Sequence, residues 1–278
     1  MTLSIIIVNW NTRQLLDECL ASIYRETKDI DFEVFIVDNN SSDHSAKMVK
    51  EKYPQTRLIE NKENRGFAAA NNQAIKLAGG EYILILNPDT IILNNALTKA
   101  VKILEAKPDA GILGARTYNK DMSQQKTVRK NPTLATQLIF PRKMKQLFPN
   151  WKALKNYYQD DFNYTAEDFV EQIQGSFMLI KKEVFDKIGL LDEKFFVWFE
   201  EIDFCKRTRT AGYKILYSPE VEIIHYGGES FSQVPTIKKQ RMYSQSLLYY
   251  FWKHKPKWQY LILLISKLPI ILISKIIK

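Results

Sequence analysis

Apolar runs and polar breaks alternate along the first 115 residues. Continuous apolar runs of strand length occupy 3–9, 32–38, 56–61, 82–87 and 110–116. The segments between them place apolar residues at helical spacing, at 12–24, 42–53, 66–79 and 95–107. Strands that are apolar throughout and alternate with helices are buried on both faces. The pattern therefore predicts an α/β fold, with a mostly parallel sheet and helices on both of its faces.

Polar residues follow the strands of this first half. They are Asn9 and Asn11, then Asp38 and Asn40, then Asn87 and Asp89 around Pro88. The carboxyl ends of parallel strands meet at one edge of a sheet, and ligands bind beyond that edge. Asp38 and Asp89 also suit turn and N-cap positions, and Asp43, just before a helix, is expected to be a cap. Polar ends on neighbouring strands nevertheless favour a binding site at this edge.

The alternation of predicted strands and helices ends at Arg116. Residues 116–172 are basic and aromatic and contain proline, and we expect them to form a variable cover over the site. Beyond this stretch, Gly175 and Ser176 interrupt a strand-like run. Because glycine leaves room beside the backbone, a ligand can approach the chain closely at this point.

Acidic residues begin a predicted helix near residue 200, directly after an aromatic cluster. The aromatic residues are Phe195, Phe196, Trp198 and Phe199, and the acids are Glu200, Glu201 and Asp203. Acids in a first turn suit the helix dipole, which is one explanation of the pattern. A carboxylate beside aromatic rings is also partly desolvated, which raises its pKa and suits it to act as a general base.

A candidate metal pair comes from two distant positions, Asp89 and His225. They offer one oxygen and one nitrogen ligand, enough to begin a Mg²⁺ or Mn²⁺ site that a diphosphate would complete. A lone histidine is more often structural, so the residues alone leave both interpretations open.

A set of short motifs, in order across residues 3–231, resembles one enzyme family. The motifs are IIIVNWNT at 5–12, VDNNSSDHS at 37–45, ENRGFAAANN at 63–72, LILNPDT at 84–90, the run 174–207 and IIHYGGES at 223–230. Each motif is weak alone, but the ordered set is highly specific. The chain resembles an inverting family 2 glycosyltransferase of the GT-A fold, of the rhamnosyltransferase-like kind.

The resemblance implies roles for individual residues. Asp89 falls on the metal-binding acid of the family's Asp-x-Asp element, and Asn87 stands in place of its first acid. His225 falls where a side chain can complete the metal site, and Glu201 falls on the catalytic base, with Asp203 as its rival. The remaining implied residues are Asn9, Asn11, Asp38, Asn40, Asn64, Arg65 and Gly66 for the nucleotide sugar, and Gly175, Ser176, Trp198 and Glu200 for the acceptor.

The implied activity is sugar transfer from a nucleotide diphosphate to a hydroxyl of a glycan or lipid-linked acceptor, with inversion, in the synthesis of cell-surface polysaccharide of a bacterial cell wall. L-Rhamnose from dTDP-rhamnose is the expected donor, and UDP-linked galactose, N-acetylglucosamine or galactofuranose are the alternatives. Residues 1–115 would bind the nucleotide sugar, and 116–235 would form the acceptor-binding and catalytic half of the same domain. A catalytically silent binding module and a nucleotidyltransferase are the competing classes.

Residues 236–278 are expected to form a basic, amphipathic helical tail. Nine Lys and Arg residues and no acid follow Ser230, so the tail carries the whole net charge of +9. A formally neutral body argues against nucleic acid and points to an anionic membrane surface as partner of the tail. Lys267, Pro269 and Lys275 interrupt its apolar run, and polar residues recur near a seven-residue period. We favour a helix lying on the membrane, with a dimerisation helix, giving a homodimer, and a true span as alternatives.

The two cysteines, Cys19 and Cys205, give neither a disulfide framework nor a zinc spacing. The N-terminal residues enter a strand at once and show no secretory signal. We therefore expect a cytoplasmic protein that lies on the inner face of the cell membrane.

Overall fold

The computed structural model describes residues 1–138, 147–148, 150–228 and 234–276 of the chain. Glu229 and Ser230 of the last motif, part of the expected cover at 116–172, and Lys278 lie outside the described residues. The first half contains β1 (Leu3–Asn9), α1 (Arg13–Glu26), β2 (Phe32–Asp38), α2 (Ser45–Lys52), β3 (Arg57–Glu60), α3 (Phe67–Ile75), β4 (Tyr82–Leu86), β5 (Thr90–Ile92), α4 (Ala96–Glu105) and β6 (Ala110–Tyr118).

The second half adds fewer strands and more helices. Its elements are α5 (Leu134–Gln137), α7 (Lys152–Tyr158), β7 (Asp168–Phe169), β8 (Phe177–Lys181), α8 (Lys182–Ile188), α9 (Glu200–Thr210), β9 (Lys214–His225), α11 (Thr236–His254) and α12 (Lys257–Ile276). Both halves share one sheet, because strands of the second half pair with strands of the first.

The sheet has the strand order β3-β2-β1-β4-β8-β6-β9-β5, with β7 paired to β9. The strands β3, β2, β1 and β4 are parallel, as the alternating pattern predicts. Beyond β4 the sheet is mixed, since β8 runs antiparallel to both β4 and β6. The α/β fold class is therefore confirmed, and the sheet is less parallel than expected because β8 inserts between β4 and β6.

Both faces of the sheet are buried, which explains the unbroken apolar runs. On β1, Ile5 and Ile7 join a core with α1, α2 and α4. The alternate residues Ile6 and Val8 join a second core with α3, α8 and α9. Successive side chains of a strand point to opposite faces, so a strand covered on both sides must be apolar at every position.

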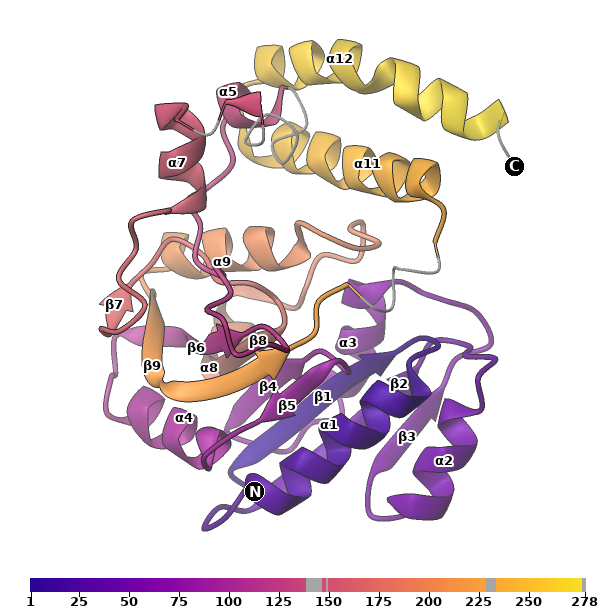
Figure 1. The fold of residues 1–278 in the computed structure, drawn as a ribbon, viewed down its shortest axis with the longest axis vertical. Helices are drawn as coiled ribbons and strands as arrows, with labels where there is room; N and C mark the ends of the chain where they lie inside the picture. Colours follow the sequence, from indigo (N-terminus) through magenta and orange to yellow (C-terminus); the bar gives the residue numbers. More distant parts are fainter. Residues whose placement is uncertain (139–146, 149, 229–233, 277–278) are drawn as a thin grey trace.

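The C-terminal helices form a third layer over the site edge of the sheet (Figure 1). α11 packs against α12, and their apolar residues form one cluster with Phe195, Phe199 and Ile202 beside α9. Lys267, in the expected polar stripe, is buried, and its Nζ donates to the Leu138 carbonyl at 3.1 Å. The polar stripe of α12 thus turns toward the protein at this residue, where the lysine finds a backbone carbonyl as partner.

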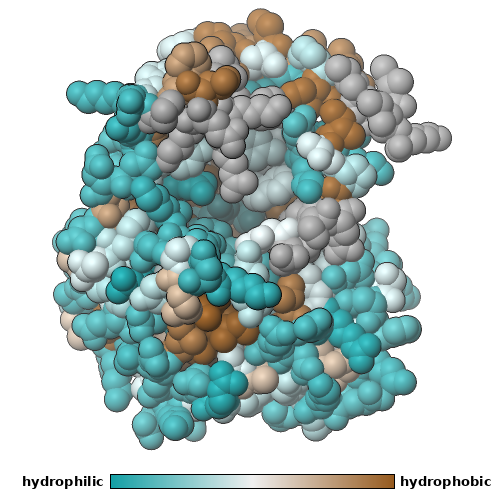
Figure 2. Space-filling model, viewed as in Figure 1, coloured by the Kyte–Doolittle hydropathy of each residue, from teal (hydrophilic) through white to brown (hydrophobic). Residues whose placement is uncertain are grey.

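The outward face of α12 is apolar instead. Its exposed large side chains follow one helical stripe: Trp258, Leu261, Ile262, Ile265, Leu268 and Leu272. Figure 2 shows hydrophobic side chains gathered along the edge of the molecule that α12 forms. Within the described residues, no helix is long and apolar enough to cross a membrane.

Candidate active site

The polar strand ends meet at one edge of the sheet, as the sequence predicts. β1 lies between β2 and β4 and is parallel to both, so Asn9, Asp38 and Asn87 end neighbouring strands. Asp43 caps the starts of two helices by accepting the backbone N–H of Arg13 at 2.7 Å and of Ser45 at 3.1 Å. It does so from one residue before the N-cap of α2, which is His44, so the carboxylate serves these N–H groups without occupying the predicted cap position.

Asn9 and Asp38 brace the loops at this edge. The Asn9 amide donates to Asp38 Oδ1 at 2.9 Å, and Asp38 Oδ2 accepts the Ser41 N–H at 2.9 Å. Both side chains are buried. Asn11 works in the same way, since its Oδ1 accepts the Ser42 N–H at 2.7 Å. These residues hold the floor of the site in place rather than line its cavity.

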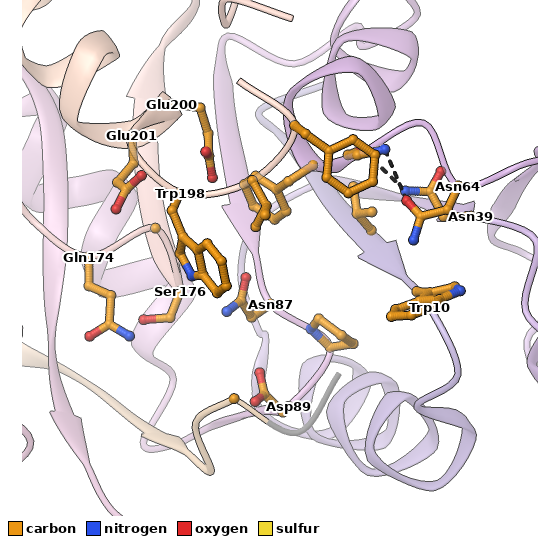
Figure 3. Close-up of a pocket in the computed structure, with 18 of the residues that line it drawn as sticks. Trp10, Asn39, Asn64, Asn87, Asp89, Gln174, Ser176, Trp198, Glu200 and Glu201 are labelled. Atoms are coloured by element: carbon orange, nitrogen blue, oxygen red, sulfur yellow. Dashed lines mark hydrogen bonds between the residues drawn. The ribbon is translucent and has the colours of Figure 1, made fainter. Parts of the chain in front are cut away.

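A cavity of about 210 Å³ opens beside these strand ends. The predicted residues that line it are Asn64, Gly66, Asn87, Asp89, Gly175, Ser176, Trp198, Glu200, Glu201 and His225. Figure 3 shows Trp10, Asn39 and Asn64 on one side of the cavity and the two glutamates on the other, with Trp198 and Asn87 between them. Asn9, Asn11, Asp38, Asn40, Arg65 and Asp203 do not line it.

Asp89 and His225 come together because β5 pairs with β9. In that antiparallel pair Thr90 lies opposite His225, which brings Asp89 Oδ1 to 3.3 Å from His225 Nε2. Both side chains are buried. Burial acts to raise the pKa of Asp89, but the His225 ring and the Gly227 N–H outweigh it, so the pKa is lowered and the carboxylate is ionised.

Gln125 fixes the proton on the other nitrogen of the His225 ring. Gln125 Oε1 lies 2.9 Å from His225 Nδ1. Gln125 Nε2 donates to the His225 carbonyl at 3.2 Å and to Asn119 Oδ1 at 2.8 Å. Since a backbone carbonyl only accepts, Nε2 must face it and Oε1 must face the ring. Nδ1 therefore carries a hydrogen, and Nε2 is the nitrogen that can exchange a proton for a metal ion.

This geometry suits a divalent cation. Asp89 Oδ1 and His225 Nε2 lie 3.3 Å apart, so one cation could bind both atoms, and its charge would offset that of the carboxylate. No group of three or more His, Cys, Asp or Glu side chains able to hold a metal occurs in the described part of the chain. The protein thus offers two ligands, and a bound diphosphate would have to supply others.

Glu200, which is buried, and Glu201, which is partly exposed, form a carboxylate pair across the cavity. Trp198 and Phe199 precede them with φ values of 63° and 71°, an unusual backbone for aromatic residues that turns the chain into α9. The Oε2 atoms of both glutamates are buried without a hydrogen-bond partner. Such unpaired oxygens are costly in a structural role and are available to a ligand.

The two glutamates differ in how far their pKa values are raised. Burial and the neighbouring Glu201 charge raise the pKa of Glu200 well above its ordinary value. Burial also raises the pKa of Glu201, but backbone N–H groups and the charge of Arg129 act in the opposite direction. Glu201 therefore ionises before Glu200, so that Glu201 can accept a proton while Glu200 keeps its own.

Asp203 lies away from the cavity in an ionic network. It accepts hydrogen bonds from Arg207 at 2.8 Å, Lys253 at 2.7 Å and His254 at 2.6 Å, and it is fully buried. Burial acts to raise its pKa, but these partners outweigh it and lower the pKa to about 2. A carboxylate held so firmly in its ionised form is a poor proton acceptor, which favours Glu201 over Asp203 as the base.

Gly66 shapes the wall of the cavity that Trp10, Asn39 and Asn64 also line. Its φ is 82°, and a Cβ built on it would lie 2.4 Å from the Phe196 carbonyl oxygen. The Asn64 side chain accepts the Gly66 N–H at 2.9 Å, and Asn39 donates to the Gly66 carbonyl at 3.2 Å. Only glycine fits this turn, which joins the loop before α3 to the aromatic segment before α9.

Sequence reasoning missed several residues of the site: Trp10, Asn39 and Gln174 in the cavity wall, and Gln125 and Arg129 behind it. Trp10 and Asn39 are direct neighbours of predicted residues, so the motifs IIIVNWNT and VDNNSSDHS could have identified them. Gln125 and Arg129 belong to the irregular stretch 116–172, where no periodic pattern marks them.

The fold and the site together define a sugar-transferring enzyme of known type. The family model described as glycosyl transferase family 2 matches residues 4–189. The chain therefore belongs to this family and is a glycosyltransferase, which confirms the resemblance stated from the motifs.

Individual relatives include proteins of bacteria and archaea. An N-acetylglucosaminyl-diphospho-decaprenol L-rhamnosyltransferase of Mycobacterium tuberculosis is 24% identical over 270 residues, covering 92% of this chain and 86% of that protein. The low-salt glycan biosynthesis hexosyltransferase Agl10 of Haloferax volcanii is 27% identical, over 80% of this chain and 66% of its own length.

Solved structures show the same fold. The mannosyltransferase PcManGT of Pyrobaculum calidifontis, in complex with GDP-Man and Mn²⁺, has a TM-score of 0.60 at 20% identity, covering 98% of this chain and 73% of that one. S. aureus TarS, residues 1–349, has a TM-score of 0.57 at 16% identity, covering 91% of this chain and 73% of that one. At these identities the likeness establishes the fold alone.

Proposed function

We propose that the protein transfers L-rhamnose from dTDP-L-rhamnose to a hydroxyl of a glycan or lipid-linked acceptor, with inversion, in cell-surface polysaccharide synthesis. The observation that carries the proposal is one cavity with Asp89 and His225, which could hold a metal ion, on one wall and the carboxylates of Glu200 and Glu201 on another. The choice of rhamnose and of a lipid-linked acceptor follows the mycobacterial relative, whose name gives both.

In this proposal the nucleotide lies on the side of Trp10, Asn39 and Asn64, and the donor diphosphate lies toward Asp89 and His225. Mn²⁺ or Mg²⁺ at that pair would neutralise the charge that develops on the departing diphosphate. Asn87 carries an amide where a second acid would bind the cation. Its Nδ2 lies 3.3 Å from His225 Nε2.

Glu201 removes the proton of the acceptor hydroxyl. As the hydroxyl oxygen bonds to the anomeric carbon, the bond from that carbon to the diphosphate oxygen breaks, and its electron pair leaves with the nucleotide. Gly175, Ser176 and Trp198 line the cavity beside the two glutamates and would orient the acceptor, with protonated Glu200 as a hydrogen-bond donor. One base and one displacement give inversion.

The exposed stripe of α12 supports contact with a membrane. Ile265 is 74% exposed and Trp258 is 56% exposed, which is unfavourable in water and favourable at a lipid interface. The same tail carries nine cations and no acid, as an anionic leaflet requires. We therefore propose a cytoplasmic enzyme lying on the inner face of the cell membrane.

Thermal unfolding with a panel of nucleotide sugars tests the proposed donor. We expect dTDP-L-rhamnose with Mn²⁺ to raise the Tm, since a ligand that binds only the folded chain stabilises it by mass action. UDP-galactose, UDP-N-acetylglucosamine and UDP-galactofuranose serve as comparisons. Stabilisation by a UDP-sugar in place of dTDP-L-rhamnose would assign the donor differently, and stabilisation by none of them would favour a silent binding module.

A further inference from the structure

A second, larger groove adjoins the active-site cavity. It has a volume of about 750 Å³ and lies between the start of α11, the segment before α9 and the end of β1. Trp10, Asn64 and Phe196 line both the groove and the cavity, so the two spaces are continuous. No residue of this groove except Asn64 was singled out from the sequence as part of the site.

The groove is cationic. Lys194, Lys238 and Arg241 line it, and none of its described lining residues is acidic. Positions 238, 241 and 245 follow helical spacing, so one face of α11 points into the groove. Neither Lys238 nor Arg241 forms a salt bridge within the described residues. Unneutralised cations around one concave space attract an anion of high charge.

The walls between these cations are apolar. Phe196 is 40% exposed, and Met242 and Val234 lie beside the cations in the same groove. α11 presents one face to this groove, and its other apolar residues pack against α12, whose outer stripe is exposed. The groove is lined by the first half of α11, and Figure 1 shows α11 beside α12, the helix that we assign to the membrane surface. A ligand with charge on an apolar chain matches such surroundings better than a free sugar does.

We propose that this groove binds the diphosphate of a lipid-linked acceptor. Arg241 offers a planar fork of N–H groups that suits phosphate oxygens, and Lys194 and Lys238 add compact charges. Phe196, which lines both spaces and lies two residues before Trp198, then leads from the anchored diphosphate to the acceptor side of the active-site cavity, while Trp10 and Asn64 face the nucleotide. The inference rests on the proposed function, since it assigns the class of acceptor to the same site.

Replacing two of the cations tests the assignment. The variant carries Lys238→Ala and Arg241→Ala, and Lys239→Ala is its matched control, because Lys239 is also on α11 but does not line the groove. The probes are phosphatidylcholine vesicles containing undecaprenyl diphosphate, and equal vesicles containing phosphatidylglycerol. Binding is measured by flotation, and the affinity for dTDP-L-rhamnose with Mn²⁺ by calorimetry.

We expect the double variant to bind the diphosphate vesicles about 25-fold more weakly, from about five-fold for each cation near an anionic headgroup. Its affinity for dTDP-L-rhamnose should be unchanged, and on phosphatidylglycerol vesicles it should lose no more binding per removed cation than the Lys239→Ala control does. A fall in donor affinity with vesicle binding unchanged would assign the groove to the nucleotide and overturn the proposal. An equal loss in the control, or on phosphatidylglycerol, would reduce the effect to general surface charge. If the wild-type protein binds no nucleotide sugar, the proposed function fails, while the vesicle comparison still tests whether the groove binds a lipid diphosphate.

Discussion

Replacing Gln125 with leucine should weaken metal binding without touching either proposed ligand. The substitution removes the acceptor 2.9 Å from His225 Nδ1 and the donor to the His225 carbonyl, so the ring is no longer held with Nε2 toward Asp89. Partners behind a metal ligand typically contribute about 10–100-fold in metal affinity. This range corresponds to a loss of about 1.4–2.8 kcal/mol in the free energy of metal binding.

Titration of Mn²⁺ followed by electron paramagnetic resonance, with dTDP present, measures this loss. Gln124→Leu is the matched control, since Gln124 pairs with Arg116 and Thr117 and does not contact the His225 ring. Asp89→Ala should abolish metal-dependent donor binding in a folded protein. Wild-type Mn²⁺ affinity in Gln125→Leu would refute the orientation argument, and unchanged affinity in Asp89→Ala would refute the metal site itself.

Three further changes probe the base, the fold and the tail. Because the Arg129 charge acts to lower the pKa of Glu201, Arg129→Leu should raise that pKa. The acidic limb of the kcat/KM profile, where the base takes up a proton, should then move to higher pH. An unchanged limb would show that the Arg129 charge does not act on the base. Gly66→Ala should lower the free energy of unfolding in urea by about 2 kcal/mol or more, from the strained φ and the clash with Phe196, and an unaffected midpoint would contradict that geometry. Ile265→Asp should leave the unfolding free energy nearly unchanged but reduce flotation with anionic vesicles, and equal flotation would remove the α12 stripe as the anchor.

The sequence pattern predicts the first half of the fold well because its signals are local. Each predicted apolar run became a strand, although the short β5 was not predicted, and each helix begins within a few residues of its predicted start, as α2 does at Ser45. The place of β8 between β4 and β6 is a pairing between distant segments, which no local pattern contains. The same holds for α12, where Lys267 turns inward and donates to the Leu138 carbonyl, a contact between distant segments.

Some residues of the site could likewise be predicted from the sequence, and others could not. Asn87, Asp89 and Glu201 could be predicted because they end strands or begin a helix inside recognisable motifs. Asp203 belongs to the same motif, yet it faces away from the cavity toward Lys253 and His254 of α11, which the motif cannot reveal. This network also joins α9 to the C-terminal layer, so removing the tail would expose a buried carboxylate beside the site.

The central claim is that Glu201 takes the proton of the acceptor in a cavity whose donor site is independent of it. Single-turnover transfer from dTDP-L-rhamnose, measured beside calorimetric donor binding in Glu201→Gln, tests this claim most directly. We predict a transfer rate lower by about 10²–10⁴-fold with donor affinity unchanged, because amide for carboxylate removes proton transfer and not binding. Near wild-type transfer by Glu201→Gln, with transfer lost in Asp203→Asn, would contradict the assignment of the base.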